Sequence, residues 1–187
     1  DVAAAYLEVV ARLRKGYERW WDKVSEQFDG TIPITLGQRA GGPVRLTTHD
    51  WRNDPVACAW NQSLIRAGMV CNGYWEVDVA EPGRYRFELR RWPREEDRAL
   101  IEGIPGPLKP FGAEIRDGWG GGSALPLVEA RLTIADNDVR SSVGSEDPAV
   151  TFDLELQAGE TRLQTYLTDE DGQVRGAYYV YIERLTG

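Results

Sequence analysis

The single histidine of the chain, His49, is the first residue to test for catalytic chemistry. It lies between Thr48 and Asp50, and neighbours in sequence form a proton relay only where the fold aims their side chains together. The sequence has no Gly-x-Ser-x-Gly turn to supply a nucleophile, and one imidazole is too few for a histidine-based metal site. We therefore expect no catalytic residue in this chain and a structural or surface role for His49.

Cysteine and acidic side chains do not have the spacing of a metal site either. Cys58 and Cys71 are the only cysteines, and their separation fits neither a Cys-x-x-Cys pair nor a four-ligand zinc site. They form either a disulfide in an oxidising compartment or two small buried thiols. The acidic stretches 136–138 and 169–172 lack the full ligand spacing of a calcium loop, so we expect turns there. The chain is predicted to bind no metal or other cofactor.

Tryptophan and arginine offer more specific chemistry, because an indole face stacks on a sugar ring and a guanidinium pairs with sulfate. Several of these residues lie close together in sequence, namely Trp51, Trp60, Trp75, Trp92 and Trp119 with Arg52, Arg66, Arg90 and Arg91. We expect Trp75 in the core, whereas the alternation places Trp92 on a polar face, under a covering loop or against a ligand. If Trp51 and Trp92 are both buried, the ligand-binding hypothesis falls and only a packing role is left.

The charge of the chain restricts its partners. The formal net charge is −8 and the isoelectric point is near 4.8. A surface that follows nucleic-acid phosphates needs an excess of Lys and Arg, and an acidic membrane surface needs the same. We therefore expect neither nucleic acid nor a membrane as a partner, and no stretch approaches the roughly 20 apolar residues of a membrane span.

A helical pattern opens the chain. Between residues 2 and 28 apolar side chains recur at spacings of three and four, at Leu7, Val10, Leu13, Tyr17, Trp20, Trp21, Val24 and Phe28. Asp29 and Gly30 end the pattern. One helix cannot bury its own apolar stripe, so we expect it to pack on the following domain or on a partner domain. The adjacent Trp20 and Trp21 form either that docking face or an ordinary core contact.

Short runs with a period of two fill the rest of the chain and are separated by Gly, Pro, Asn and Asp. The runs are Ile32–Leu36, Val44–Thr48, Trp75–Val79, Tyr85–Leu89, Leu132–Ile134, Val150–Leu156, Leu163–Leu167 and Tyr178–Ile182. The sequence therefore predicts a mainly β fold of roughly eight or nine strands, an antiparallel β-sandwich of jelly-roll-like form with an N-terminal amphipathic helix. A core of this size suits one domain, so we expect a helical linker over 1–29 and a sandwich over 30–187.

Two connections are specified less well. A two-residue loop at Pro82-Gly83 would set Val79 opposite Arg86 and mix the polar and apolar faces. Either that loop is of odd length or the two strands belong to different sheets. The segment from Glu95 to Ser123 is rich in Gly and Pro and has no periodicity, which predicts a long surface loop that serves a function or moves.

Several short motifs recur together in one known family. They are Leu46 to Trp51, Trp60-Asn61-Gln62, Gly73 to Val79, Pro82 to Tyr85, Leu89 to Pro93, Gly159-Glu160-Thr161 and Gly176 to Tyr181. In this order they resemble the C-terminal, non-catalytic domain of bacterial arylsulfatases, members of the sulfatase family. The resemblance covers most of the chain after the first helix, and the helix resembles the linker that leaves the catalytic domain.

The resemblance implies a parent enzyme that hydrolyses sulfate esters with a calcium ion and a formylglycine. The formylglycine motif is Cys- or Ser-x-Pro-Ser-Arg, and neither Cys58 nor Cys71 lies in one. Calcium and all catalytic residues are therefore expected only in a catalytic domain outside this chain, and the implied location is periplasmic or secreted.

Two functions follow as hypotheses. The first is a domain that packs on its own sulfatase catalytic domain through the helix and forms the rim of the substrate cleft. The second is a stand-alone carbohydrate-binding module for sulfated polysaccharide. The candidate rim residues are Trp51, Trp60, Gln62, Arg90 and Trp92.

Overall fold

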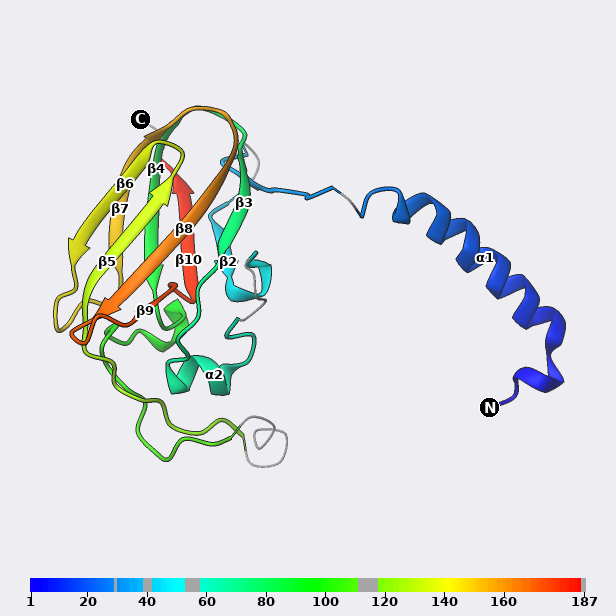
Figure 1. The fold of residues 1–187 in the computed structure, drawn as a ribbon, viewed down its shortest axis with the longest axis horizontal. Helices are drawn as coiled ribbons and strands as arrows, with labels where there is room; N and C mark the ends of the chain where they lie inside the picture. Colours follow the sequence, from blue (N-terminus) through cyan, green and yellow to red (C-terminus); the bar gives the residue numbers. More distant parts are fainter. Residues whose placement is uncertain (29, 39–41, 53–57, 111–117, 186–187) are drawn as a thin grey trace. The chain divides into compact units, whose positions relative to one another are not determined.

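The chain divides into two compact units in the computed structural model (Figure 1). Unit 1 spans Asp1–Ile32 and unit 2 spans Pro33–Gly187. The structure describes residues 1–28, 30–38, 42–52, 58–110 and 118–185. None of the helices within these ranges is long and apolar enough to span a membrane.

Unit 1 consists of a short 3₁₀ turn, η1 (Ala3–Ala5), and one α-helix, α1 (Leu7–Ser25). The aromatic side chains gather on one stretch of the helix, where the rings of Tyr17 and Trp20 lie 5.7 Å apart and those of Trp21 and Phe28 lie 5.3 Å apart. No residue of α1 is buried. The helix thus has the predicted amphipathic pattern over a shorter span, and its aromatic stripe has no core of its own.

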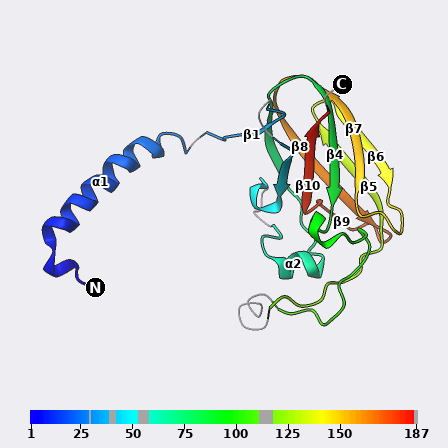
Figure 2. The same cartoon turned by 180° about the vertical axis from the view of Figure 1, so that it is seen from behind.

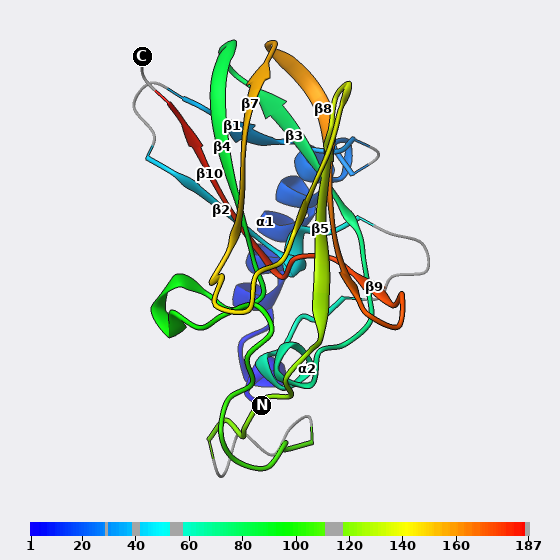
Figure 3. The ribbon, with the colours of Figure 1, turned by 90° about the vertical axis from the view of Figure 1, so that its left-hand side faces the viewer.

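Unit 2 is a sandwich of two β-sheets, as predicted, and the two layers face each other in Figure 3. The strands are β1 (Ile34–Leu36), β2 (Val44–Thr47), β3 (Tyr74–Val79), β4 (Gly83–Arg90), β5 (Leu127–Ile134), β6 (Asn137–Ser142), β7 (Val150–Leu156), β8 (Gly159–Asp169), β9 (Val174–Arg175) and β10 (Tyr179–Arg184). One sheet has the order β1-β3-β8-β5-β6 with β9 beside β8, and the other has the order β2-β10-β4-β7. All pairs are antiparallel except β1 with β3.

The Pro82-Gly83 connection joins the two sheets. β3 pairs with β1 and β8, whereas β4 pairs with β10 and β7. Val79 and Tyr85 therefore both face the interior from opposite layers, and both are buried. The sequence left open whether the loop is of odd length or the two strands lie in different sheets. In the structure β3 and β4 lie in different sheets, and the apolar face of each strand points inward.

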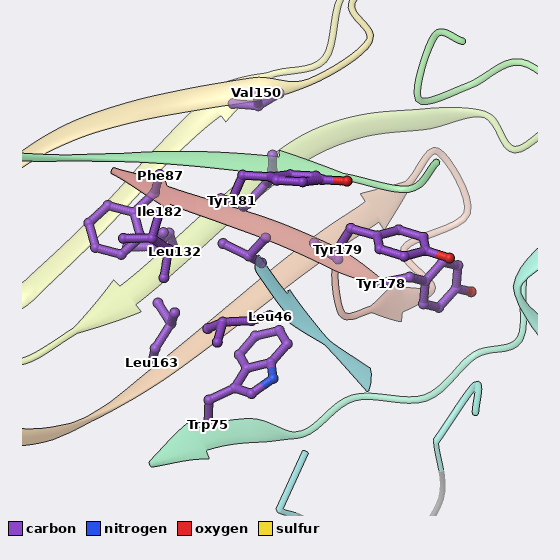
Figure 4. Packing of buried hydrophobic residues seen from close by; sticks show 14 of the residues in the cluster. Leu46, Trp75, Phe87, Leu132, Val150, Leu163, Tyr178, Tyr179, Tyr181 and Ile182 are labelled. Carbon is purple, nitrogen blue, oxygen red and sulfur yellow. The ribbon is translucent and has the colours of Figure 1, made fainter. Parts of the chain in front are cut away.

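The core lies between the two layers, and Figure 4 shows Phe87 and Ile182 from one sheet near Leu132 and Leu163 from the other. Trp75 is fully buried in this core, as expected, and its indole Nε1–H donates to the carbonyl oxygen of Thr47 at 2.8 Å. Because a buried indole N–H needs an acceptor, this bond ties the first sheet to the end of β2.

Short helical elements and a long loop cover one end of the sandwich (Figure 2). They are η2 (Thr48–Asp50), α2 (Gln62–Ala67), η3 (Arg94–Glu96) and the described residues 97–110 and 118–126 of the long loop from η3 to β5. The Asn61 side chain accepts from the Ser63 N–H at 2.7 Å and so caps α2, and Gly68 ends that helix in a left-handed conformation with a φ of 71°. These elements place side chains around the first residues of β10.

Candidate functional site

A groove with a volume of about 430 Å³ lies where β2 and β10 meet α2 and the long loop. It is lined by Arg45, Thr47, Thr48, His49, Ala59, Trp60, Asn61, Gln62, Ile65, Trp119, Tyr178 and Tyr179. Two of the lining residues are large and exposed, since Trp60 is 51% exposed and Trp119 is 47% exposed. A large exposed ring inside a hollow is unusual for a soluble domain and is typical of a ligand-binding surface.

Two consecutive side chains hold the segment that carries Trp60. The Thr48 hydroxyl is buried and donates to the Ala59 carbonyl oxygen at 2.8 Å. The His49 Nε2–H donates to the Trp60 carbonyl oxygen. A carbonyl only accepts, so this bond requires a proton on Nε2. Both donors belong to η2, which follows β2 directly, and the second sheet therefore fixes the backbone on which Trp60 is mounted.

The floor of the groove is polar. Gln62 begins α2, and its amide Nε2 donates to the Tyr179 hydroxyl at 2.5 Å. Tyr179 opens β10, beside Tyr178 in Figure 4. Burial raises the pKa of the Tyr179 phenol, and although the bond from Gln62 and the charge of Arg45 act against it, the net shift is upward. The phenol therefore stays protonated at neutral pH and can donate a hydrogen bond into the groove.

The long loop brings Trp119 to the groove. Arg66 of α2 donates from Nη1 to the Gly120 carbonyl oxygen, and Lys109 donates to the Gly118 carbonyl oxygen at 3.1 Å. Gly121 donates from its backbone N–H to the Pro107 carbonyl oxygen at 2.8 Å. A Cβ on Gly121 would lie 2.0 Å from the Gly106 carbonyl oxygen, so only glycine permits this close approach of two backbone segments.

The structure corrects the predicted rim at three of its five positions. Trp51 is 7% exposed and packs on Trp75 with 5.6 Å between ring centroids. Trp92 is 1% exposed and donates from Nε1 to the Glu102 carbonyl oxygen at 2.9 Å, beneath the long loop. Arg90 is buried and donates to a Glu88 carboxylate oxygen at 2.7 Å. The strand alternation fails for Arg90 and Trp92 because the loop folds back over their polar face.

The other two predicted rim residues, Trp60 and Gln62, do line the groove. Because Trp51 and Trp92 are buried, the form of the ligand-binding hypothesis that used their rings falls, and a binding site requires other, exposed residues. The structure instead places Trp60 and Trp119, about 60 positions apart in the chain, on the lining of one groove. A tryptophan inside a glycine-rich, aperiodic loop was the available signal for Trp119, since an apolar ring there has no strand face to bury it.

Two other hollows differ from the groove in their chemistry. One contains Asp136, Glu155 and Glu160, and the second contains Asp97, Glu102 and Glu146. Neither is lined by an aromatic side chain among the residues that the structure describes. Of these three hollows, as lined by the described residues, only the groove combines aromatic rings with neutral and cationic polar groups.

Neither cysteine is among the residues that line the groove. Cys71 is buried and Cys58 is half-buried, and both are free thiols. Of the two possibilities given by the sequence, a disulfide or two thiols, the structure has two thiols. Burial raises the pKa of the Cys71 thiol, which holds it in the protonated form. Across the described parts of the chain there is no group of three or more His, Cys, Asp or Glu side chains that could hold a metal ion.

No protein-family model matches the chain, and neither does any curated protein sequence. Among solved structures, it is similar to a ruminal GH26 endo-β-1,4-mannanase at 12% identity and a TM-score of 0.38, over 81% of this chain and 28% of that one. It is also similar to a CBM35 from Cellvibrio japonicus at 12% identity and a TM-score of 0.35, over 80% and 92% of the two chains. A family 35 carbohydrate binding module from Clostridium thermocellum matches at 14% identity and a TM-score of 0.38, over 78% and 100%. Because these sequence identities and TM-scores are low, the function proposed below rests on the groove and not on the similar structures.

Proposed function

We propose that unit 2 is a non-catalytic saccharide-binding domain and that the groove is its binding site. The observation that carries the proposal is the pair of half-exposed rings, Trp60 and Trp119, on one hollow with polar donors. A sugar ring has an apolar face and an equatorial belt of hydroxyls. In the groove, the indole rings offer a surface for the apolar face of the sugar, and the Gln62 amide and the Tyr179 phenol offer hydrogen-bonding groups for its hydroxyls.

The position of the two rings also favours binding over packing. A side chain that serves the core is held by neighbours on all sides, as Trp75 is. Trp60 instead has its backbone held by His49 and Thr48 through neighbouring carbonyls, while half of its side-chain surface is open. A rigid mount with an exposed ring is what a preorganised stacking platform requires, because little conformational freedom is lost on binding.

The experiment is a titration of the 187-residue chain with a panel of neutral and charged oligosaccharides, followed by calorimetry. Trp60→Ala and Trp119→Ala should each weaken binding by about 1–3 kcal/mol, the scale of one buried aromatic side chain. Trp20→Ala is the matched control, because Trp20 is 54% exposed but belongs to α1. Its affinity should equal that of the unaltered chain.

Two results would contradict the proposal. One is the absence of saturable binding to every member of the panel. The other is binding that Trp60→Ala and Trp119→Ala leave unchanged, which would place the saccharide elsewhere on the protein.

A second candidate function is supported by the aromatic stripe of α1. Tyr17, Trp20 and Trp21 lie together on a helix that buries none of its own residues. Such a stripe suits a helix that packs on a larger domain, and the sequence resemblance proposes the catalytic domain of a periplasmic or secreted arylsulfatase, a sulfuric ester hydrolase. In that setting the groove would present saccharide beside the parent enzyme's substrate cleft.

This second candidate is tested by mixing the chain with a separately expressed arylsulfatase catalytic domain and measuring co-elution on size exclusion. The proposal predicts a complex that the double substitution Trp20→Glu with Trp21→Glu abolishes. Elution as two separate species for the unaltered chain would remove the candidate and would leave the saccharide site untouched.

A further inference from the structure

The charges around the groove restrict which saccharides it can hold. None of its twelve described lining residues is Asp or Glu, although the chain has 30 acidic residues among 187. The lining does contain one permanent cation, Arg45 of β2. We infer that the groove selects an anionic saccharide, one that carries a carboxylate or a sulfate, and that Arg45 is its anion contact. This inference rests on the proposed saccharide-binding function.

Arg45 differs from two nearby arginines, Arg90 of β4 and Arg94 of η3, in how firmly it is paired. Arg90 donates to Glu88 at 2.7 Å, and Arg94 donates to the same carboxylate at 2.5 Å. Arg45 lies 3.8 Å from Glu95, and the two side chains are 54% and 72% exposed. An exposed ion pair at that separation contributes little to stability, so a ligand anion can replace Glu95 at low cost.

Arg45 is also placed to act together with the groove floor. Its strand pairs with β10, where Arg45 lies opposite Tyr181 and Thr47 lies opposite Tyr179. Burial has the largest effect and raises the pKa of the Tyr179 phenol; the positive charge of Arg45 opposes this shift, and the negative charge of Glu95 adds to it. Both charges therefore lie within electrostatic reach of the Tyr179 hydroxyl, and an anion between Arg45 and Tyr179 would meet a cation and a hydrogen-bond donor.

The net negative charge of the whole chain opposes the binding of an anionic saccharide. With a net charge of −8, the protein repels a polyanion at long range, so any attraction must come from a local group. A polyanion bound through scattered surface lysines would not depend on one arginine. Dependence on Arg45 therefore separates a built site from general attraction.

The test compares polysaccharide pairs that share a backbone, namely dextran with dextran sulfate and methyl-esterified with de-esterified polygalacturonate, at 0.15 M salt. The charged member of a pair should bind more tightly, and Arg45→Gln should weaken it about fivefold, the effect of one ion pair. Glu95→Gln should strengthen it about twofold, because the competing carboxylate is removed. Arg45→Lys keeps the charge and should keep most of the affinity.

The two polysaccharide pairs also distinguish the two anions. Tighter binding of the charged member in the dextran pair alone would identify sulfate as the preferred group, and tighter binding in the polygalacturonate pair alone would identify carboxylate.

Failure of this inference is distinguishable from failure of the proposed function. If Trp60→Ala abolishes binding while Arg45→Gln and Glu95→Gln change nothing, or change affinity in the same direction, the groove binds saccharide without selecting an anion. If neither polysaccharide pair nor the neutral oligosaccharides bind, both proposals fall.

Discussion

His49 donates a hydrogen bond from Nε2 to the backbone carbonyl oxygen of Trp60, eleven positions later in the chain. The neighbouring Thr48 makes the matching bond to Ala59 at 2.8 Å. The only histidine of the chain thus holds the backbone of an exposed tryptophan. Its location on η2 links the edge strand β2 to one wall of the groove.

The first prediction concerns this bond. His49→Ala removes the donor, so the Trp60 carbonyl oxygen loses this hydrogen bond and saccharide affinity should fall severalfold. The free energy of unfolding should change by less than about 0.5 kcal/mol at this exposed site. His49→Gln retains an N–H donor and should restore part of the affinity. Calorimetric titration and urea unfolding measure the two quantities. Equal affinity for all three proteins would show that the bond has no part in positioning Trp60.

The second prediction concerns Trp92, which strand alternation places on a polar face and the structure places under the long loop. Trp92→Phe removes buried volume and the donor to Glu102, so it should lower the free energy of unfolding by about 1–3 kcal/mol. The folded variant should keep its saccharide affinity within about twofold. Trp60→Phe is the control and should show the opposite pattern, with unchanged stability and weaker binding. A Trp92→Phe protein with unchanged stability and no saccharide binding would contradict this prediction and would indicate that Trp92 contacts the ligand.

The third prediction concerns a buried ion pair, Arg175 with Asp169, in which the nitrogen and oxygen are 3.0 Å apart. Burial alone would raise the pKa of the Asp169 carboxyl, but hydrogen bonds from Arg175 and from the Gln173 backbone N–H outweigh it and hold that pKa below its ordinary value. The pair therefore stabilises the fold above the unfolded-state pKa of about 3.9, and this contribution is lost as pH falls through the lower folded-state pKa.

Asp169→Asn tests this pair because it leaves the Arg175 guanidinium buried without its counter-charge. At pH 7 the substitution should lower the free energy of unfolding by about 3–5 kcal/mol. Urea unfolding between pH 7 and pH 2 should show the difference from the unaltered chain shrinking toward the acid end, once Asp169 is protonated in both states. A difference that stays constant over this range would contradict the linkage.

Much of the sandwich could be predicted because several of its strands alternate apolar and polar residues, most clearly β3. The residues Trp75, Val77 and Val79 in β3 point inward, and the polar residues between them point outward. The sequence does not predict β6, because Val139 is the only apolar residue of Asn137–Ser142 and this edge strand therefore shows no alternation. α2 was missed because its six residues are too few to show a helical period.

The groove could be predicted only in part. Trp60 and Gln62 are two positions apart in the motif Trp60-Asn61-Gln62, which makes them candidates from the sequence. Arg45, Tyr179 and Trp119 join them only through the β2–β10 pairing and the return of the long loop. Contacts over such sequence separations leave no local pattern, and burial of Trp51 and Trp92 depends on the same long-range packing.

The most direct test of the groove is a titration followed by the indole N–H signals of the seven tryptophans in an NMR spectrum of the ¹⁵N-labelled chain. Binding in the groove predicts saturable shifts of the Trp60 and Trp119 signals when the preferred saccharide is added. The Trp20 and Trp21 signals of α1 and the buried Trp75 signal should stay in place. Saturable binding with no shift at Trp60 and Trp119, or shifts confined to the α1 tryptophans, would contradict the assignment of this groove as the saccharide site.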